Sequence, residues 1–223
     1  MTTRSQRVGP TSVVIAGATG WAGSALALGV HAAPDLELIG AVSRSHAGAS
    51  LGDILGDEGI QAPIFGTAAE ALEQRPDVFV EYTKPEAARA HARAALEAGS
   101  HVVIGTSGLD DADFAALDTA ARDADRGALA CGNFSLTAVL MMRFSALAAE
   151  WIRHWEILDY AGASKRDAPS GTARELAERL GRVASPEVGV PVHEIQGARE
   201  ARGADLAGTR VHSIRLPHYV LGV

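Results

Sequence analysis

Short apolar runs and Ala-rich amphipathic stretches alternate along the first part of the chain. The runs lie at 12–16, 36–42, 77–82, 101–104 and 127–131, and they have the length of short buried strands; the first, SVVIA, is rich in β-branched residues. The stretches between them lie at 21–33, 85–98 and 110–124 and are bounded by Pro, Gly or Asp, as helices are. A Gly-rich region at 45–66 predicts a long loop with a short helix. The alternation predicts right-handed βαβ units and a parallel sheet.

The pattern changes after about residue 132. A longer apolar helix is expected at 136–151, a strand at 155–161, an amphipathic helix at 171–182 and a further strand at 209–216. Residues 184–208 are rich in Pro, Gly and charge and are expected to be irregular. The predicted fold class is therefore α/β, with an N-terminal Rossmann-type parallel sheet at 1–133 and a C-terminal α+β domain at 134–223.

The charge balance and the apolar segments exclude several classes of protein. The formal net charge is −7, and no cluster of Lys and Arg marks a nucleic-acid surface. No apolar stretch is long and uncharged enough to cross a membrane, and the polar N-terminus lacks a signal-peptide core. The single cysteine, Cys131, cannot form an internal disulfide, and no His, Cys and Asp cluster has metal-ligand spacing. We expect a cytoplasmic protein without a metal site.

A glycine-rich turn follows the first predicted strand and opens the first predicted helix. Its three glycines are spaced as G-x-x-G-x-x-G within the segment IAGATGWAG. Glycines allow close approach of a pyrophosphate, which the free N–H groups of the helix N-terminus bind. A turn that serves only tight helix–sheet packing is the alternative. The turn predicts a dinucleotide site made by Gly17, Ala18, Thr19, Gly20, Trp21 and Gly23.

The end of the second predicted strand bears on the choice of cofactor. An acidic residue there would hold the ribose hydroxyls of NADH, but the chain has Ser43 and Arg44. Arg44 can pair with the 2′-phosphate of NADPH, so NADPH is favoured and NADH stays possible; a solvated surface arginine is the alternative. Thr83, Gly105 and Thr106 follow two further strands, at the sheet edge where ligands bind. Ordinary turn chemistry is the other explanation of these loops.

The segment SKRDAPSGT combines a lysine with a helix start. Ser170, Gly171 and Thr172 follow a proline, so their N–H groups and hydroxyls form an anion site. Lys165 adds a positive charge close upstream. The segment predicts binding of a carboxylate-bearing small molecule. Simple N-capping by Ser170 or Thr172, with Lys165 on the surface, explains it equally well.

Six motifs occur in a fixed order along nearly the whole chain. They are GATGWAG, EYTKPEAARAH, HVVIGTSGL, GNFSLTAVLMMRF, KRDAPSGTA and VHSIRLP. This ordered set resembles the 4-hydroxy-tetrahydrodipicolinate (dihydrodipicolinate) reductase family. The resemblance implies an NAD(P)H-dependent enzyme of lysine and diaminopimelate biosynthesis, which reduces a cyclic dicarboxylate and forms homotetramers through the C-terminal sheet. The family continues beyond VHSIRLP, so the C-terminal domain is expected to be incomplete at Val223.

The resemblance also implies roles for single residues. The domain at 1–133 would bind the dinucleotide, with Arg44 at its adenosine end. The nicotinamide pocket would be shaped by Thr83, Gly105, Thr106, Asn133 and Phe134. The domain at 134–223 would bind the dicarboxylate substrate and form the oligomer, and its substrate residues would be Lys165, Ser170, Gly171 and Thr172.

The chain departs from the family pattern at one place. The family usually has a His-His pair before the lysine, and Ala161 and Gly162 occupy those positions here. The first histidine is taken as the proton donor, and loss of a general acid typically costs ~10²–10⁴-fold in rate. We expect Lys165 to take over this catalytic role; Tyr160, Ser164 and a bound water are the other candidates. An imine reductase for another carboxylated substrate and a non-catalytic dinucleotide-binding protein are therefore alternative functions.

Overall fold

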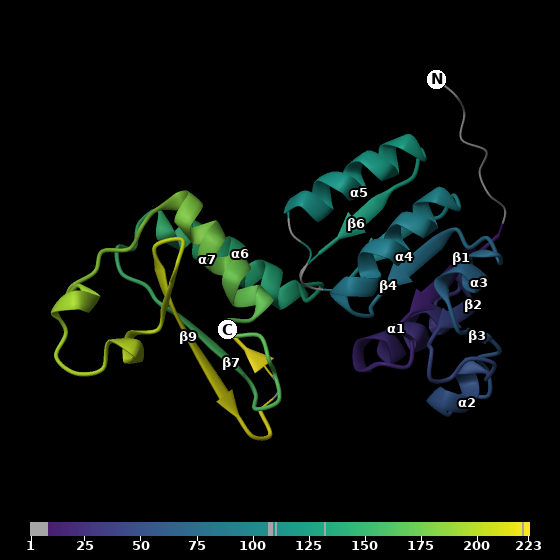
Figure 1. The fold of residues 1–223 in the computed structure, drawn as a ribbon, viewed down its shortest axis with the longest axis horizontal. Coiled ribbons are helices and arrows are strands. Elements are labelled where there is room, and N and C mark those ends of the chain that lie inside the picture. Colours follow the sequence, from purple (N-terminus) through teal and green to yellow (C-terminus); the bar gives the residue numbers. More distant parts are fainter. Residues whose placement is uncertain (1–8, 107–108, 110, 132, 220) are drawn as a thin grey trace. The chain divides into compact units, whose positions relative to one another are not determined.

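The computed structural model describes residues 9–106, 109, 111–131, 133–219 and 221–223. The chain divides into two compact units, Met1–Cys131 and Gly132–Val223 (Figure 1). Each unit has its own sheet and its own hydrophobic core. Within the described ranges, no helix has the length and apolar character that crossing a membrane requires.

The first unit is built around a parallel sheet. Its strands are β1 (Thr11–Ala16), β2 (Leu36–Val42), β3 (Ile64–Phe65), β4 (Val78–Glu81), β5 (His101–Ile104) and β6 (Ala128–Ala130). They run in the order β3-β2-β1-β4-β5-β6. This is the order of a Rossmann sheet, in which the direction of winding switches between β1 and β4. The predicted fold class is confirmed for this unit.

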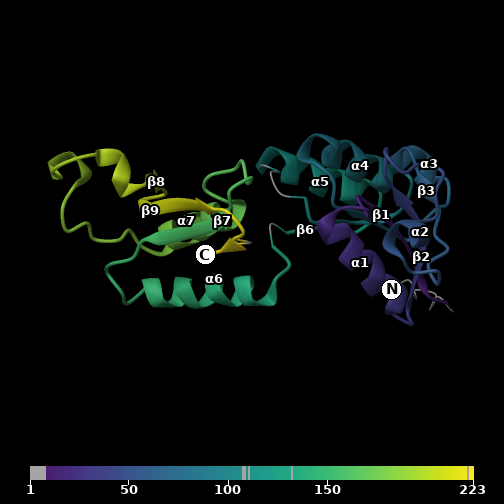
Figure 2. The same cartoon turned by 90° about the horizontal axis from the view of Figure 1, so that it is seen from below.

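Helices cover both faces of this sheet. They are α1 (Trp21–Ala32), α2 (Leu51–Leu55), α3 (Ala68–Leu72), α4 (Pro85–Glu97) and α5 (Asp111–Asp123). Figure 2 shows α1 on one side of the strands and α4 and α5 on the other. Val13 and Ile15 of β1 pack in the core under α1, whereas Val14 packs in the core under α4 and α5. Burial on both faces explains why the strands read as continuous apolar runs in the sequence.

Two short elements correct the sequence prediction. The loop expected at 45–66 contains α2 but ends in the strand β3, and the unpredicted helix α3 follows. The Thr67 hydroxyl accepts from the N–H of Glu70 at 3.2 Å, and the Glu70 carboxylate accepts from the N–H of Thr67 at 3.2 Å. This capping box fixes the start of α3. Both elements are too short for hydrophobic periodicity to reveal them.

The second unit has a mixed sheet with two helices packed on it, which confirms its predicted α+β character. Its strands are β7 (Ile157–Gly162), β8 (Ala204–Leu206), β9 (Thr209–Leu216) and β10 (Leu221–Gly222), in the order β10-β7-β9-β8. The helices are α6 (Leu136–Ala149) and α7 (Gly171–Val183). The stretch predicted as irregular contains β8 and two 3₁₀ helices, η1 (Val192–Glu194) and η2 (Arg199–Arg202).

The central strands of this sheet, β7 and β9, are parallel. Asp159 lies opposite Ser213, and Ala161 lies opposite Arg215. Burial alternates along β7, and Ile157 packs in a core with residues of α7. Because successive side chains point to opposite faces, Asp159 and Ala161 face α7 as Ile157 does.

Candidate functional site

The glycine turn joins β1 to α1 as one strand–turn–helix unit. Gly17 has a positive φ of 83°, a conformation that other residues avoid. A Cβ on Gly23 would lie 2.1 Å from the carbonyl oxygen of Gly17. Both positions therefore require glycine, and the turn holds together all of the predicted residues Gly17, Ala18, Thr19, Gly20, Trp21 and Gly23.

The N-terminus of α1 is left without a side-chain cap. Its N-cap residue is Gly20, and the first turn contains no acidic residue. Trp21, the first residue of the helix, is 83% exposed. The N–H groups of the first turn and the positive end of the helix dipole are therefore available to an anion such as a pyrophosphate.

The carboxyl ends of β4 and β5 bring three predicted residues together around Glu81. The N–H of Thr83 donates to Oε1 of Glu81 at 2.7 Å, and the Thr83 hydroxyl donates to the same oxygen. The buried Thr106 hydroxyl lies 3.5 Å from this oxygen. The N–H of Gly105 donates to the Glu81 carbonyl at 2.9 Å. Glu81 therefore organises both loops of the predicted nicotinamide pocket.

Glu81 was missed by the sequence analysis. Its side chain is fully buried, and it also accepts a hydrogen bond from Nδ1 of His91 in α4 at 2.7 Å. A buried carboxylate needs such donors, because the cost of removing it from water is otherwise large. The signal in the sequence was an acidic residue at the last position of an otherwise apolar strand.

The end of β2 lies beside the glycine turn. Oγ of Ser43 is 3.2 Å from Oγ1 of Thr19 and 3.2 Å from Nδ1 of His46. Arg44 is exposed and forms no ion pair with any described residue. The segment 43–47 contains no acidic residue. The arrangement offers hydroxyl, imidazole and guanidinium groups at this edge of the sheet, which are suited to a phosphate.

In the second unit, the predicted substrate residues gather where β7 leads into α7. Ser170 is the N-cap of α7, and its hydroxyl accepts from the N–H of Ala173 at 3.3 Å. Nδ2 of Asn133 donates to the Thr172 hydroxyl at 3.2 Å, so Asn133 reaches the same turn. Nζ of Lys165 pairs with Oδ1 of Asp167 at 2.9 Å. Gly171 is the first residue of the helix. Phe134, predicted for the nicotinamide pocket, follows Asn133 in the chain and is 46% exposed.

A buried ion pair lies beneath this turn. Oδ2 of Asp159 accepts from the N–H of Ser170 at 2.8 Å and pairs with Nη2 of Arg215 at 3.0 Å. Burial acts to raise the pKa of Asp159, but the hydrogen bonds from Ser170 and then Arg215 outweigh it and hold this pKa below its usual value. Asp159 therefore stays charged at neutral pH. The sequence analysis did not predict this pair.

The positions that lack histidine lie on the same strand. Ala161 is buried and faces α7, whereas Tyr160 lies on the opposite face of the sheet. The Tyr160 ring packs against Tyr219, with ring centroids 5.6 Å apart. Ser164 lies in the exposed turn before Lys165. Of the candidate proton donors, Ser164 and Lys165 lie in the segment between β7 and α7, and Tyr160 faces away from α7.

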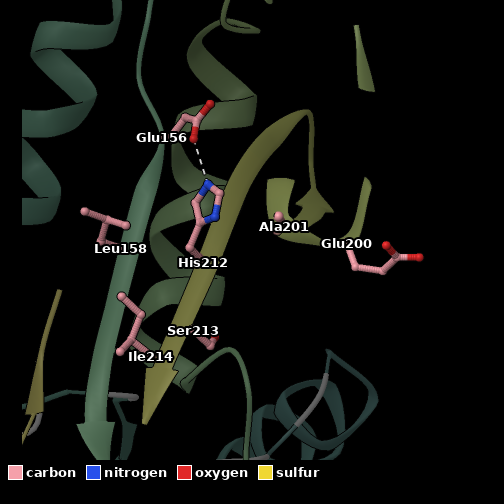
Figure 3. A pocket seen from close by; sticks show the side chains of 8 residues that line it. Glu156, Leu158, Glu200, Ala201, His212, Ser213 and Ile214 are labelled. Carbon is pink, nitrogen blue, oxygen red and sulfur yellow. Dashed lines mark hydrogen bonds and ion pairs between the residues drawn. The ribbon is translucent and has the colours of Figure 1, made fainter. Parts of the chain in front are cut away.

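A pocket of about 500 Å³ lies elsewhere in the second unit (Figure 3). It is lined by Glu156, Leu158, Glu200, Ala201, Gly203, His212, Ser213 and Ile214. Nε2 of His212 donates to Glu156 at 2.7 Å, and the guanidinium of Arg202 donates to the same carboxylate. These contacts, led by Arg202, lower the pKa of Glu156. The pocket contains none of the predicted site residues.

Metal chemistry finds no support in the described residues. They contain no group of three or more His, Cys, Asp or Glu side chains that could hold a metal ion. Cys131, at the end of the first unit, is half-buried and is not part of a disulfide.

Comparison with known proteins places the chain among the reductases that its motifs resemble. Sequence models of dihydrodipicolinate reductase match along the chain, the N-terminal one at residues 11–134 and the C-terminal one at 137–222. A 4-hydroxy-tetrahydrodipicolinate reductase of Thermosynechococcus vestitus is 37% identical over 93% of this chain and 78% of its own length. That of Geobacillus kaustophilus is also 37% identical, over 93% and 79%.

A solved structure agrees with the sequence relatives. The dipicolinate-bound dihydrodipicolinate reductase of Paenisporosarcina sp. TG-14 superposes with a TM-score of 0.73 at 30% identity, covering 95% of this chain and 81% of that one. Both units, their motifs and their order are thus matched by one family. The chain therefore belongs to the dihydrodipicolinate reductase family, and it is an NAD(P)H-dependent oxidoreductase that reduces 4-hydroxy-tetrahydrodipicolinate in lysine and diaminopimelate biosynthesis.

Proposed function

We propose that the first unit binds NADPH at the β1–α1 turn and that the second unit binds the substrate carboxylates at the start of α7. The observation that carries this proposal is a pair of strand–turn–helix anion sites, one in each unit. Gly17 and Gly23 permit the tight turn of the first, and Ser170 caps the helix of the second, five residues after Lys165.

The residues of the first unit fit a dinucleotide. A Cβ at Gly17 or Gly23 would collide with the backbone of Tyr82 or Gly17, so glycine at both positions permits the tight turn, and the uncapped first turn of α1 offers a pyrophosphate N–H donors. Thr83, Gly105 and Thr106 hold the nicotinamide end through their shared contacts with Glu81. When bound, the reduced nicotinamide supplies the hydride.

The preference for NADPH over NADH rests on the end of β2. Arg44 has no ion pair within the described residues, and it lies next to the Ser43 and His46 side chains, which contact each other. No acidic residue is present to hold the ribose diol of NADH. Replacement of Arg44 by Ala should lower kcat/KM for NADPH by about tenfold or more, since a hydrogen bond to a charged group contributes ~1.5–3 kcal/mol. The value for NADH should stay unchanged.

The substrate is a cyclic dicarboxylate, as is the ligand of the Paenisporosarcina relative. The N–H groups at Gly171 and Thr172 and the Lys165 ammonium bind its carboxylates. Lys165 also takes the role of the missing histidine, because its side chain offers a donor in the segment that leads from β7 into α7. Asp167, which pairs with this Nζ, orients it.

The turnover assay uses NADPH oxidation with freshly generated 4-hydroxy-tetrahydrodipicolinate. Lys165→Ala should lower kcat by ~10²-fold or more, the usual contribution of a general acid. Arg166→Ala is the matched control, because Arg166 is an exposed neighbour outside the proposed site, and it should retain activity. Turnover by Lys165→Ala at the wild-type rate would remove Lys165 from the mechanism.

Self-association into a homotetramer is proposed through the second sheet. The face turned away from α7 carries the exposed side chains of Leu158 and Leu216. Analytical ultracentrifugation of Leu158→Lys should show smaller assemblies than the wild type.

A further inference from the structure

We infer that Arg215 is a positioning residue for the substrate anion site, acting through Asp159 and the backbone of the turn before α7. The inference rests on the proposed function, because it concerns how the turn at Lys165 and Ser170 is held for a dicarboxylate.

The guanidinium of Arg215 and the carboxylate of Asp159 face α7 from neighbouring strands. Their side chains are 16% and 1% exposed, and Nη2 lies 3.0 Å from Oδ2. An ion pair this deeply buried contributes little net stability, because desolvation offsets the attraction. Its presence under a ligand-binding turn therefore calls for another explanation.

The pair holds both ends of the segment from Asp167 to Ser170. Nη2 of Arg215 donates to the carbonyl of Asp167 at 2.6 Å. Oδ2 of Asp159 accepts from the N–H of Ser170 at 2.8 Å. The first contact fixes the residue that pairs with Lys165, and the second fixes the N-cap of α7. One guanidinium–carboxylate pair thus sets the lysine and the helix N-terminus relative to each other.

The remaining contacts tie Arg215 and Asp159 to the strands β7 and β9. Nη1 of Arg215 donates to the carbonyls of Asp159 at 3.2 Å and Ile214 at 3.1 Å. The Ser213 hydroxyl donates to Asp159 at 3.1 Å. Nε of Arg215 is a buried side-chain atom without a hydrogen-bond partner within the described residues. Arg215 is also the register partner of Ala161, one of the two positions without histidine.

The reaction kinetics separate this role from a purely structural one. Arg215→Met keeps the length of the side chain and removes its charge and donors. We expect KM for the dicarboxylate to rise roughly thirtyfold to a hundredfold, the range for loss of a charge-assisted hydrogen bond. KM for NADPH should stay within about twofold of the wild type. Arg215→Lys should recover part of the loss, because an ammonium can reach one of the two anchors but not both.

A double variant separates an effect on the position of the turn, seen in KM, from an effect on the stability of the protein, seen in urea unfolding. Arg215→Met alone leaves Asp159 as an uncompensated buried charge, which lowers stability. Asp159→Asn with Arg215→Met removes both charges, so resistance to urea should return while the raised KM persists. Arg210→Met is the control on the same strand, because Arg210 pairs with Asp205 at 3.4 Å away from the turn. It should leave KM unchanged.

Binding of pyridine-2,6-dicarboxylate, measured by calorimetry, tests the inference without turnover. The wild type should bind it, and Arg215→Met should bind it roughly thirtyfold more weakly. This result would support the positioning role even if the assay with 4-hydroxy-tetrahydrodipicolinate failed. Wild-type affinity in Arg215→Met would overturn the inference. So would an equal rise in the KM values for the dicarboxylate and for NADPH. Recovery of both KM and stability in the double variant would overturn it as well. So would absence of binding by the wild type.

Discussion

Replacement of Glu81 tests whether the buried carboxylate holds the two loops of the cofactor pocket. Four donor groups contact this side chain: the N–H and hydroxyl of Thr83, the hydroxyl of Thr106 and Nδ1 of His91. Glu81→Leu leaves all four without this acceptor at a position that is fully buried. The expected cost is about 4 kcal/mol of unfolding free energy, because each buried donor left without an acceptor costs ~1–3 kcal/mol. Glu81→Gln keeps one acceptor and should cost about 2 kcal/mol.

The assay combines stability with cofactor affinity. Urea unfolding followed by circular dichroism gives the free energy of unfolding, and titration with NADPH gives the Kd. In Glu81→Gln this Kd should rise roughly tenfold, because Thr83 and Thr106 lose hydrogen bonds to the carboxylate. Glu97→Gln is the matched control, because Glu97 pairs with Arg93 on the exposed surface of α4. It should leave the stability and the Kd unchanged, because an exposed ion pair is screened by solvent. A Glu81→Leu variant as stable as this control, with an unchanged Kd, would refute the reasoning.

Three further changes test other parts of the site. Gly23→Ala places a Cβ 2.1 Å from the Gly17 carbonyl oxygen and should weaken NADPH binding about tenfold or more in a fluorescence titration. Gly29→Ala is the control on the same helix; it has open space around it and should stabilise the chain by about 1 kcal/mol. Ala161→His should raise kcat about tenfold or more. The activity of this variant should fall as pH rises through the imidazole pKa of about 6.5, because the proton donor is then lost. An unchanged pH–rate profile would argue against a proton donor at this position. Because the pKa of Asp159 is lowered on folding, its charge contributes stability above about pH 4 that is lost as pH falls through the folded-state value. Asp159→Asn should therefore flatten the acid side of a urea-unfolding series, and an unaltered slope would contradict the pKa direction.

Local sequence patterns predicted those parts of the fold and site that are local in the chain. The continuous apolar runs of the first unit predicted β1, β2 and β4 because burial on both faces leaves a strong signal. The short strand β3 carried no such signal. Helix α3 could have been found from its capping box, since Thr67 and Glu70 have the required spacing.

The site follows the same rule. Lys165 and Ser170 are close in sequence, so one segment was enough to predict that they share a site. Arg215 and Asp159 come from strands far apart in the chain, and their pairing depends on the parallel register of β7 and β9. Glu81 contacts Thr83 within its own loop, but its contacts with Gly105 and Thr106 depend on the pairing of β4 with β5. Single-sequence patterns carry no information about such long-range partners.

The uncapped start of α1 links cofactor binding to the folding of the first unit. Helix α7 is capped by the Ser170 side chain. The N-cap of α1 is Gly20, which offers no side-chain acceptor to the first N–H groups of the helix. In the proposed complex, the phosphates of the dinucleotide act as the missing cap. A ligand at a hundred times its Kd adds about 2.7 kcal/mol to the stability of the state that binds it. The proposed site therefore predicts that nucleotide above its Kd makes this unit unfold less often and resist proteolysis longer, whereas the start of α7 is capped by the Ser170 side chain whether or not nucleotide is bound.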